Sequence, residues 1–152
     1  MKPSTRRWTL SWAAALGFAL LAGCQSIPPN SLATHDSQRW EKEIRALEAA
    51  DAAAKLPAGG IVFVGSSSIK RWQTLAGDFP GLPVVNHGFG GSQLADSFHF
   101  ADRIIIRNQP RQVVIYAGGN DINAGKDPEI VFGDFVALVK KLRAALPHAR
   151  IS

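Results

Sequence analysis

Short apolar runs alternate with helical patterns along this sequence, and that alternation constrains the fold more than any other feature. Three runs cover residues 61–64, 83–86 and 112–117, and residues 150–152 begin a fourth. The run 61–64 is apolar at every position, as expected for a strand that is buried on both faces. Strands separated by helices pair in parallel through right-handed crossovers. The sequence therefore predicts an α/β fold in which helices cover a parallel sheet.

Helices are predicted before and between these strands. An amphipathic pattern spans residues 37–55, a short helical segment follows the first strand up to Leu75, and a longer pattern spans residues 92–107. A third inter-strand helix is predicted to begin at Asp127 and Pro128, which are typical of a helix cap and first turn. The residues expected on its buried face are Val131, Phe135, Leu138 and Leu142.

The first two dozen residues have the pattern of a leader rather than of a folded body. Basic residues are followed by an uncharged stretch of 15 residues from Trp8 to Ala22. This stretch is shorter than the roughly 20 apolar residues that span a bilayer as a helix. We therefore expect a signal peptide over residues 1–23, a tether over 24–36 and one domain over 37–152.

Composition and charge exclude several classes of protein. The sequence is 46% hydrophobic and 19% charged, as in a globular domain and unlike a disordered chain. The net charge of +5 includes three basic residues of the predicted leader, so the remainder is close to neutral and nucleic acid is not an expected partner. One cysteine cannot form an intramolecular disulfide or a zinc cluster. No metal or organic cofactor is expected.

Three polar or glycine-rich motifs follow the three predicted strands. They are Gly-Ser-Ser-Ser-Ile at residues 65–69, Asn-His-Gly-Phe-Gly-Gly at 86–91 and Gly-Gly-Asn-Asp at 118–121. Each motif by itself is also typical of a helix cap or a tight turn. Because the carboxyl ends of parallel strands share one edge of a sheet, we expect the three motifs to lie close together.

The chemistry of these motifs suits acyl transfer. A serine hydroxyl can act as the nucleophile, and backbone N–H groups and a side-chain amide can stabilise the oxyanion that develops on the carbonyl oxygen. The second glycine of the Gly-x-Ser-x-Gly elbow is missing, because Ile69 stands in its place. This departure argues against the α/β-hydrolase fold.

The three motifs resemble blocks I, II and III of the SGNH/GDSL hydrolases, the family of GDSL-like lipases and acylhydrolases. The resemblance implies a flavodoxin-like, three-layer α/β/α sandwich and a cofactor-independent serine esterase. It also implies that Ser67 is the nucleophile and that Gly91 and Asn120 complete the oxyanion hole. Ser66 stands where most family members have aspartate, and Ser66 and Ser68 remain rival nucleophiles.

The general base that this family uses has no convincing counterpart in the sequence. The family takes it from an Asp-x-x-His block near the C-terminus, and Asp96 and His99 have that spacing but precede the third motif. His99 is expected on a helix surface or in packing. His87 is expected to be exposed or to make a turn contact, and the alternative is a role in shaping the pocket. His148 is expected at the opposite end of the sheet and His35 in the tether. We therefore expect the Asp-x-x-His block to lie beyond the end of this sequence, so that the domain is incomplete at its C-terminus and the given chain is inactive or weakly active.

The end of the leader, Leu-Ala-Gly-Cys at residues 21–24, resembles the lipobox of bacterial lipoproteins. The resemblance implies that Cys24 becomes lipidated and holds the protein to a membrane through a lipid anchor. The non-acidic residue that follows, Gln25, favours the outer membrane. The expected location is the bacterial cell envelope, with the domain facing the periplasm.

Together these features predict a membrane-anchored serine esterase that acts on small-molecule carboxylic esters. The candidate substrates are lysophospholipids, short-chain acyl esters and O-acetylated sugars. The alternative is a non-catalytic binding lipoprotein with the same fold, which the missing base favours. A nucleotide-binding flavodoxin-like domain fits least well, because the Ser-rich motif lacks the lysine or repeated glycines of a phosphate loop.

Overall fold

The structure is a computed structural model that describes residues 28–55 and 58–152. The predicted signal peptide and the predicted lipidation site Cys24 lie outside the described residues. Within the described ranges, no helix combines the length and the apolar character that crossing a bilayer requires.

A four-stranded parallel sheet forms the centre of the molecule. Its strands are β1 (Ile61–Gly65), β2 (Val84–Gly88), β3 (Gln112–Tyr116) and β4 (Arg150–Ile151), and their order in the sheet is β2-β1-β3-β4. The chain passes from β1 to one neighbour, β2, and then crosses to the other side of β1 to form β3. This order and the parallel pairing confirm the predicted α/β fold, and the four strands lie where the apolar runs placed them.

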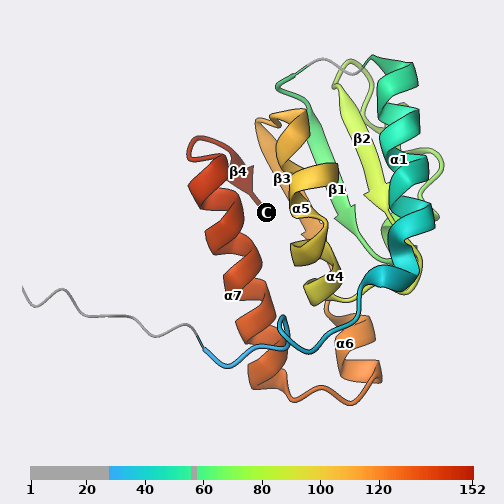
Figure 1. The fold of residues 1–152 in the computed structure, drawn as a ribbon. Coiled ribbons are helices and arrows are strands. Elements are labelled where there is room, and N and C mark those ends of the chain that lie inside the picture. Colours follow the sequence, from blue (N-terminus) through green and yellow to red (C-terminus); the bar gives the residue numbers. More distant parts are fainter. Residues whose placement is uncertain (1–27, 56–57) are drawn as a thin grey trace, which may run out of the picture.

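Helices lie in front of the sheet and around the ends of its strands (Figure 1). The N-terminal helix α1 is preceded by a short 3-10 helix, and α4 and α5 are followed by another. The helical bounds are η1 (Gln38–Trp40), α1 (Glu41–Ala54), α2 (Ser67–Lys70), α3 (Leu75–Asp78), α4 (Leu94–His99), α5 (Ala101–Ile104), η2 (Ile106–Asn108), α6 (Gly119–Asn123) and α7 (Pro128–Ala145).

Strand alternation divides the apolar side chains between two cores. Val62, Val64 and Val113 point to the face that α1, α4, α5 and α7 cover, and they form the larger core with apolar residues of these helices. Ile61 and Phe63 point to the opposite face, where they pack against residues of the segment that contains α2 and α3. The sheet therefore has helices on both faces, which confirms the predicted three layers.

Two details differ from the predicted helices. The pattern at residues 92–107 is not one helix, because it breaks at Phe100, whose buried ring packs edge-on against Phe89 with centroids 6.1 Å apart. On α7, Phe135 is 39% exposed, so its predicted burial is wrong. Asp134 is fully buried instead, because a polar network at the end of the sheet neutralises its charge.

The N-terminal helix is held to the body by polar contacts. The Arg103 guanidinium on α5 donates to Glu41 at 2.7 Å and to Glu48 at 2.6 and 2.9 Å. The hydrogen bonds from Arg103, with a second one from Arg45, lower the pKa of Glu41 from its ordinary value of 4.5 to about 2, and those from Arg103 lower the pKa of Glu48 as well. The contacts join α5 to two acidic residues of α1 that lie about two helical turns apart.

Candidate active site

The three candidate motifs lie at the same end of the sheet. Gly65, the last residue of β1, is paired with Gly88 of β2 and with Tyr116 of β3. Residues 65–69, 86–91 and 118–121 therefore leave the sheet at its carboxyl edge, close to the point where the strand order reverses. Open α/β sheets bind ligands at this kind of crevice.

Two glycines allow the chain segments at this edge to approach closely. A Cβ at Gly65 would lie 2.1 Å from the carbonyl oxygen of Tyr116, and a Cβ at Gly88 would lie 2.1 Å from the backbone nitrogen of Lys70. Both obstacles are backbone atoms of neighbouring segments. The glycines therefore set how near the Ser-rich turn sits to the other two strands.

A cavity of about 270 Å³ opens between the first and third motifs. It is lined by Ser66, Ser67, Ser68, Tyr116, Ala117, Gly119 and Asn120. The structure therefore brings the predicted nucleophile and the predicted carboxamide donor into one cavity. The lining residues carry hydroxyl, amide and apolar groups but no formal charge.

Ser67 is the first residue of α2 and is half-buried. Within the described part of the chain, its backbone N–H donates to no protein acceptor, so this N–H is available to a ligand. Ser66 is the half-buried cap residue of α2, and Ser68 is exposed. All three serines line the cavity, so its lining does not by itself select among them.

Asn120 and Gly91 lie next to each other. The Asn120 Nδ2 donates to the carbonyl oxygen of Ser92 at 2.8 Å, which fixes the carboxamide and leaves its second N–H free. A Cβ at Gly91 would lie 4.0 Å from this same Nδ2. Gly91 is exposed, does not line the cavity, and donates its N–H to no acceptor among the described residues.

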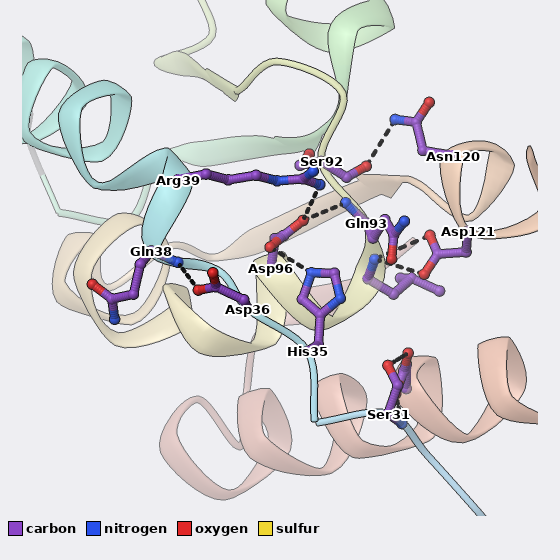
Figure 2. A network of polar contacts seen from close by, with 12 residues as sticks. Ser31, His35, Asp36, Gln38, Arg39, Ser92, Gln93, Asp96, Asn120 and Asp121 are labelled. Atoms are coloured by element: carbon purple, nitrogen blue, oxygen red, sulfur yellow. Dashed lines mark hydrogen bonds and ion pairs between the residues drawn. The ribbon is translucent and has the colours of Figure 1, made fainter. Parts of the chain in front are cut away.

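Residues 89–94 carry Gly91, which the sequence analysis predicts to be part of an oxyanion hole, and are here called the oxyanion loop. The Ser92 hydroxyl donates to the carbonyl oxygen of Gly65 at 3.3 Å. Two buried carboxylates then accept from the next two backbone N–H groups: Asp96 from Gln93 at 2.8 Å, and Asp121 from Leu94 at 3.2 and 3.3 Å (Figure 2).

Asp121 belongs to a buried network of charged side chains that also contains Lys126 and Asp134. The Lys126 Nζ lies 3.0 Å from the Asp121 carboxylate and 2.9 Å from that of Asp134, and both carboxylates are fully buried. Burial opposes the charge on Lys126, but the hydrogen bonds to Asp134 and Asp121 outweigh it and raise the pKa of Lys126 above 10.5. The ammonium therefore stays charged and offsets part of the cost of burying two carboxylates.

None of the four histidines lines the cavity in the described structure. His99 is exposed on α4, and His148 is exposed just before β4 at the opposite end of the sheet, so both predictions are confirmed. The prediction for His87 is wrong: it is 1% exposed, with its ring bonded to the Ile104 carbonyl and to the Asp51 carboxylate. His35 was predicted to lie in the tether, but its side chain contacts the Asp96 carboxylate of the folded body.

His35 and Asp96 form a histidine–carboxylate pair that the sequence analysis missed. The His35 Nε2 lies 2.8 Å from the Asp96 Oδ1, across 61 positions in the sequence. No local pattern relates residues so far apart. Asp134 did carry a signal, since it stands on the same helical face as Val131 and Leu138, where a charge needs a partner.

Within the described residues, no group of three potential ligand side chains is arranged to hold a metal ion.

Residues 56–152 match the model of the GDSL-like Lipase/Acylhydrolase family. No curated protein matches the chain.

Solved structures of other proteins share this fold. A protein from Streptococcus pneumonia described as a candidate platelet activating factor has a TM-score of 0.65 at 16% identity, over 75% of this chain and 53% of its own. A GDSL-like lipase from Bacteroides thetaiotaomicron has a TM-score of 0.59 at 20% identity, over 76% and 56%. A candidate acylhydrolase from Bacteroides fragilis has a TM-score of 0.57 at 24% identity, over 75% and 54%. The chain thus spans about half the length of these structures.

Proposed function

The chain belongs to the GDSL-like lipase/acylhydrolase family, and from this premise we propose that it acts as a serine esterase with Ser67 as its nucleophile. The observation that carries the proposal is the single cavity that Ser67 and Asn120 both line, with Gly91 beside Asn120. In this proposal three groups donate to the oxyanion: the N–H of Ser67, the N–H of Gly91, which does not line the cavity itself, and the second amide N–H of Asn120.

In the proposed reaction, the Ser67 Oγ attacks the carbonyl carbon of the ester, and its proton passes to a base. The carbonyl electron pair moves onto the oxygen, and the three donors stabilise the resulting oxyanion. When the intermediate collapses, the bond to the alcohol oxygen breaks and the alcohol leaves with the proton. Water then hydrolyses the acyl-enzyme by the same sequence of steps. These steps use no metal or organic cofactor.

The reaction requires a base, and the described cavity contains no histidine. The proposal therefore needs a histidine supplied to Ser67 from outside the cavity lining, in the manner of the triad in serine hydrolases. The open reading frame downstream of residue 152 tests this requirement. An in-frame Asp-x-x-His would meet it.

The proposed substrates are lysophospholipids, short-chain acyl esters or O-acetylated sugars. We also propose that Cys24 is lipidated and that the domain is held at the periplasmic face of the outer membrane. Support for the anchor comes from the sequence of the leader alone. A Cys24→Ser protein that still partitions with membranes would contradict it.

Labelling with a serine-reactive fluorophosphonate tests the nucleophile. The unsubstituted protein, in a full-length form that includes a downstream Asp-x-x-His block, is expected to be labelled on the peptide that contains Ser67, as located by mass spectrometry, and Ser67→Ala in the same form is expected to lose the label. Ser66→Ala and Ser68→Ala are the matched controls and are expected to keep it. Label that persists in Ser67→Ala removes Ser67 as the nucleophile.

The second candidate function is a non-catalytic binding lipoprotein, which the absence of a histidine from the described cavity favours. The two functions differ in turnover. An unsubstituted protein that is neither labelled nor able to hydrolyse p-nitrophenyl acetate, yet binds an ester ligand in a Ser67-dependent manner, is a binder. Turnover that depends on Ser67 identifies the esterase.

A further inference from the structure

We propose that residues 28–40 form a strap that positions the oxyanion loop, with His35 and Ser31 as positioning residues. The inference rests on the proposed function, since it assigns these residues to the oxyanion hole of that reaction. In Figure 1 the strap crosses the lower ends of α7 and α4 before it enters α1. It thus runs past the carboxyl edge of the sheet, where the candidate site lies.

The first attachment of the strap is His35. Its Nε2 lies 2.8 Å from the Oδ1 of Asp96, whose Oδ2 accepts from the backbone N–H of Gln93 at 2.8 Å. Asp96 is fully buried and the His35 side chain is 13% exposed, and the Arg39 guanidinium lies 3.9 Å from the same carboxylate (Figure 2). One carboxylate therefore connects the strap directly to the oxyanion loop.

The second attachment is Ser31. Its backbone N–H and its hydroxyl both donate to the Asp134 carboxylate at 2.7 Å, and its hydroxyl accepts from Lys126 at 2.8 Å. Lys126 also contacts Asp121 at 3.0 Å, and Asp121 accepts from the backbone N–H of Leu94. Ser31 is therefore connected, through Lys126 and Asp121, to α6, which carries Asn120, and to the backbone N–H of Leu94 in the oxyanion loop.

Close packing fixes the strap at both ends. A Cβ at the buried Gly133 of α7 would lie 1.8 Å from the carbonyl oxygen of Pro29, so α7 and the strap are in direct backbone contact there. At the other end, a Cβ at Gly90 would lie 2.0 Å from the ring of Trp40. Gly90 belongs to the oxyanion loop, and its φ of 36° is one that L side chains rarely adopt.

These contacts give the strap a role in catalysis because an oxyanion hole depends on the placement of its donors. A misplacement of about 1 Å can reduce a rate about a hundredfold even when the substitution is far from the chemistry. Asp96 and Asp121 hold two consecutive backbone N–H groups directly after Ser92, which in turn accepts from Asn120. A shift of either carboxylate would therefore move Gly91 and Asn120 relative to Ser67.

Substitution of His35 in the full chain tests the strap with two readouts. The first is hydrogen exchange of the Gln93 and Leu94 backbone amides by NMR, which does not depend on activity. The second is kcat for p-nitrophenyl acetate together with KM. In His35→Ala, exchange of the Gln93 amide is expected to accelerate about tenfold or more, and kcat is expected to fall about tenfold to a hundredfold at unchanged KM.

Two further variants make the test specific. Gln38→Ala changes an exposed side chain of the same strap and is expected to match the unsubstituted protein in both readouts. His35→Gln keeps an N–H donor for Asp96 and is expected to recover most of kcat. Where His35→Ala does not fold, Gly133→Ala displaces the strap by its contact with Pro29 and is expected to give the same two effects.

The outcomes separate the strap from the proposed function. Exchange of Gln93 in His35→Ala that stays within about twofold of Gln38→Ala would overturn the strap. Faster exchange with unchanged kcat would overturn its positioning role. An unsubstituted protein that shows no Ser67-dependent turnover contradicts the proposed function. The positioning role of the strap in that reaction then fails as well. The exchange data still report whether the strap holds the oxyanion loop.

Discussion

Asn120 has two tasks at the scale of single residues. One amide N–H holds the oxyanion loop through the carbonyl of Ser92 at 2.8 Å, and the other is free at the cavity. Asn120→Ala is expected to lower kcat about 10²- to 10³-fold, because one donor to the oxyanion is lost. Kinetics with p-nitrophenyl acetate measure the effect. Asn123→Ala, an exposed change on the same short helix, is the control, and an equal loss in both variants would contradict the assignment.

Gly88 and Gly91 are expected to respond very differently to the same substitution. Gly88→Ala places a Cβ 2.1 Å from the Lys70 backbone nitrogen and is expected to cost about 3 kcal/mol of unfolding free energy or more. Gly91→Ala meets nothing closer than 4.0 Å and is expected to cost less than about 1 kcal/mol. Urea unfolding measures both.

The activity of Gly91→Ala can also be compared with that of Asn120→Ala. Alanine keeps the backbone N–H that the proposed oxyanion hole uses, so Gly91→Ala is expected to lose less activity than Asn120→Ala. A loss of stability in Gly91→Ala as large as in Gly88→Ala would show that the oxyanion loop is packed more tightly than the structure indicates.

At the scale of elements, α7 is the longest helix of the described chain and carries Asp134 of the buried charge network. Its cap is Asp127, whose carboxylate accepts from the Glu129 backbone N–H at 2.8 Å, with Pro128 in the first turn. Asp127→Ala is expected to lower the unfolding free energy by about 1 kcal/mol, because one terminal N–H loses its acceptor.

Urea unfolding of Asp127→Ser provides the matched control for this prediction. Serine also accepts a hydrogen bond at a helix cap, so this variant is expected to recover most of the loss. Equal destabilisation by both variants would mean that the charge of Asp127, rather than the cap hydrogen bond, stabilises α7.

At the scale of the whole molecule, acid is expected to weaken the attachment of α1. The hydrogen bonds from Arg103, together with a smaller contribution from Arg45, lower the pKa of Glu41 to about 2. A carboxylate whose pKa is lowered by folding stabilises the folded state fully above its ordinary pKa, here 4.5, and loses this contribution as the pH falls towards 2. Stability is therefore expected to decline over this range.

Arg103→Gln isolates the contribution of these ion pairs to the acid dependence. Urea midpoints compared between about pH 6 and about pH 3 are expected to fall less steeply in the variant than in the unsubstituted protein. Parallel curves for the two proteins would show that other carboxylates cause the decline. Arg45→Gln, at a largely exposed partner of Glu41, is the control and is expected to change the slope less.

The sequence was sufficient for the features that local patterns encode. Apolar runs placed the four strands, and Asp127 with Pro128 placed the start of α7, because strand burial and helix capping depend on residues close together in the chain. The expectation that three motifs meet at one edge also needed only parallel pairing. The burial of Phe135 was predicted incorrectly, because periodicity gives a helical face and not what covers it.

Only the tertiary structure decided which distant groups bond to the buried carboxylates at the candidate site. The pairs His35–Asp96 and Ser31–Asp134 join residues 61 and 103 positions apart. Burial of a carboxylate is tolerated where donors converge on it, and convergence of this kind is a property of packed elements rather than of any short segment. The sequence by itself determined which elements form and where their polar ends point; packing decided that a segment before the first helix holds the loop at those ends.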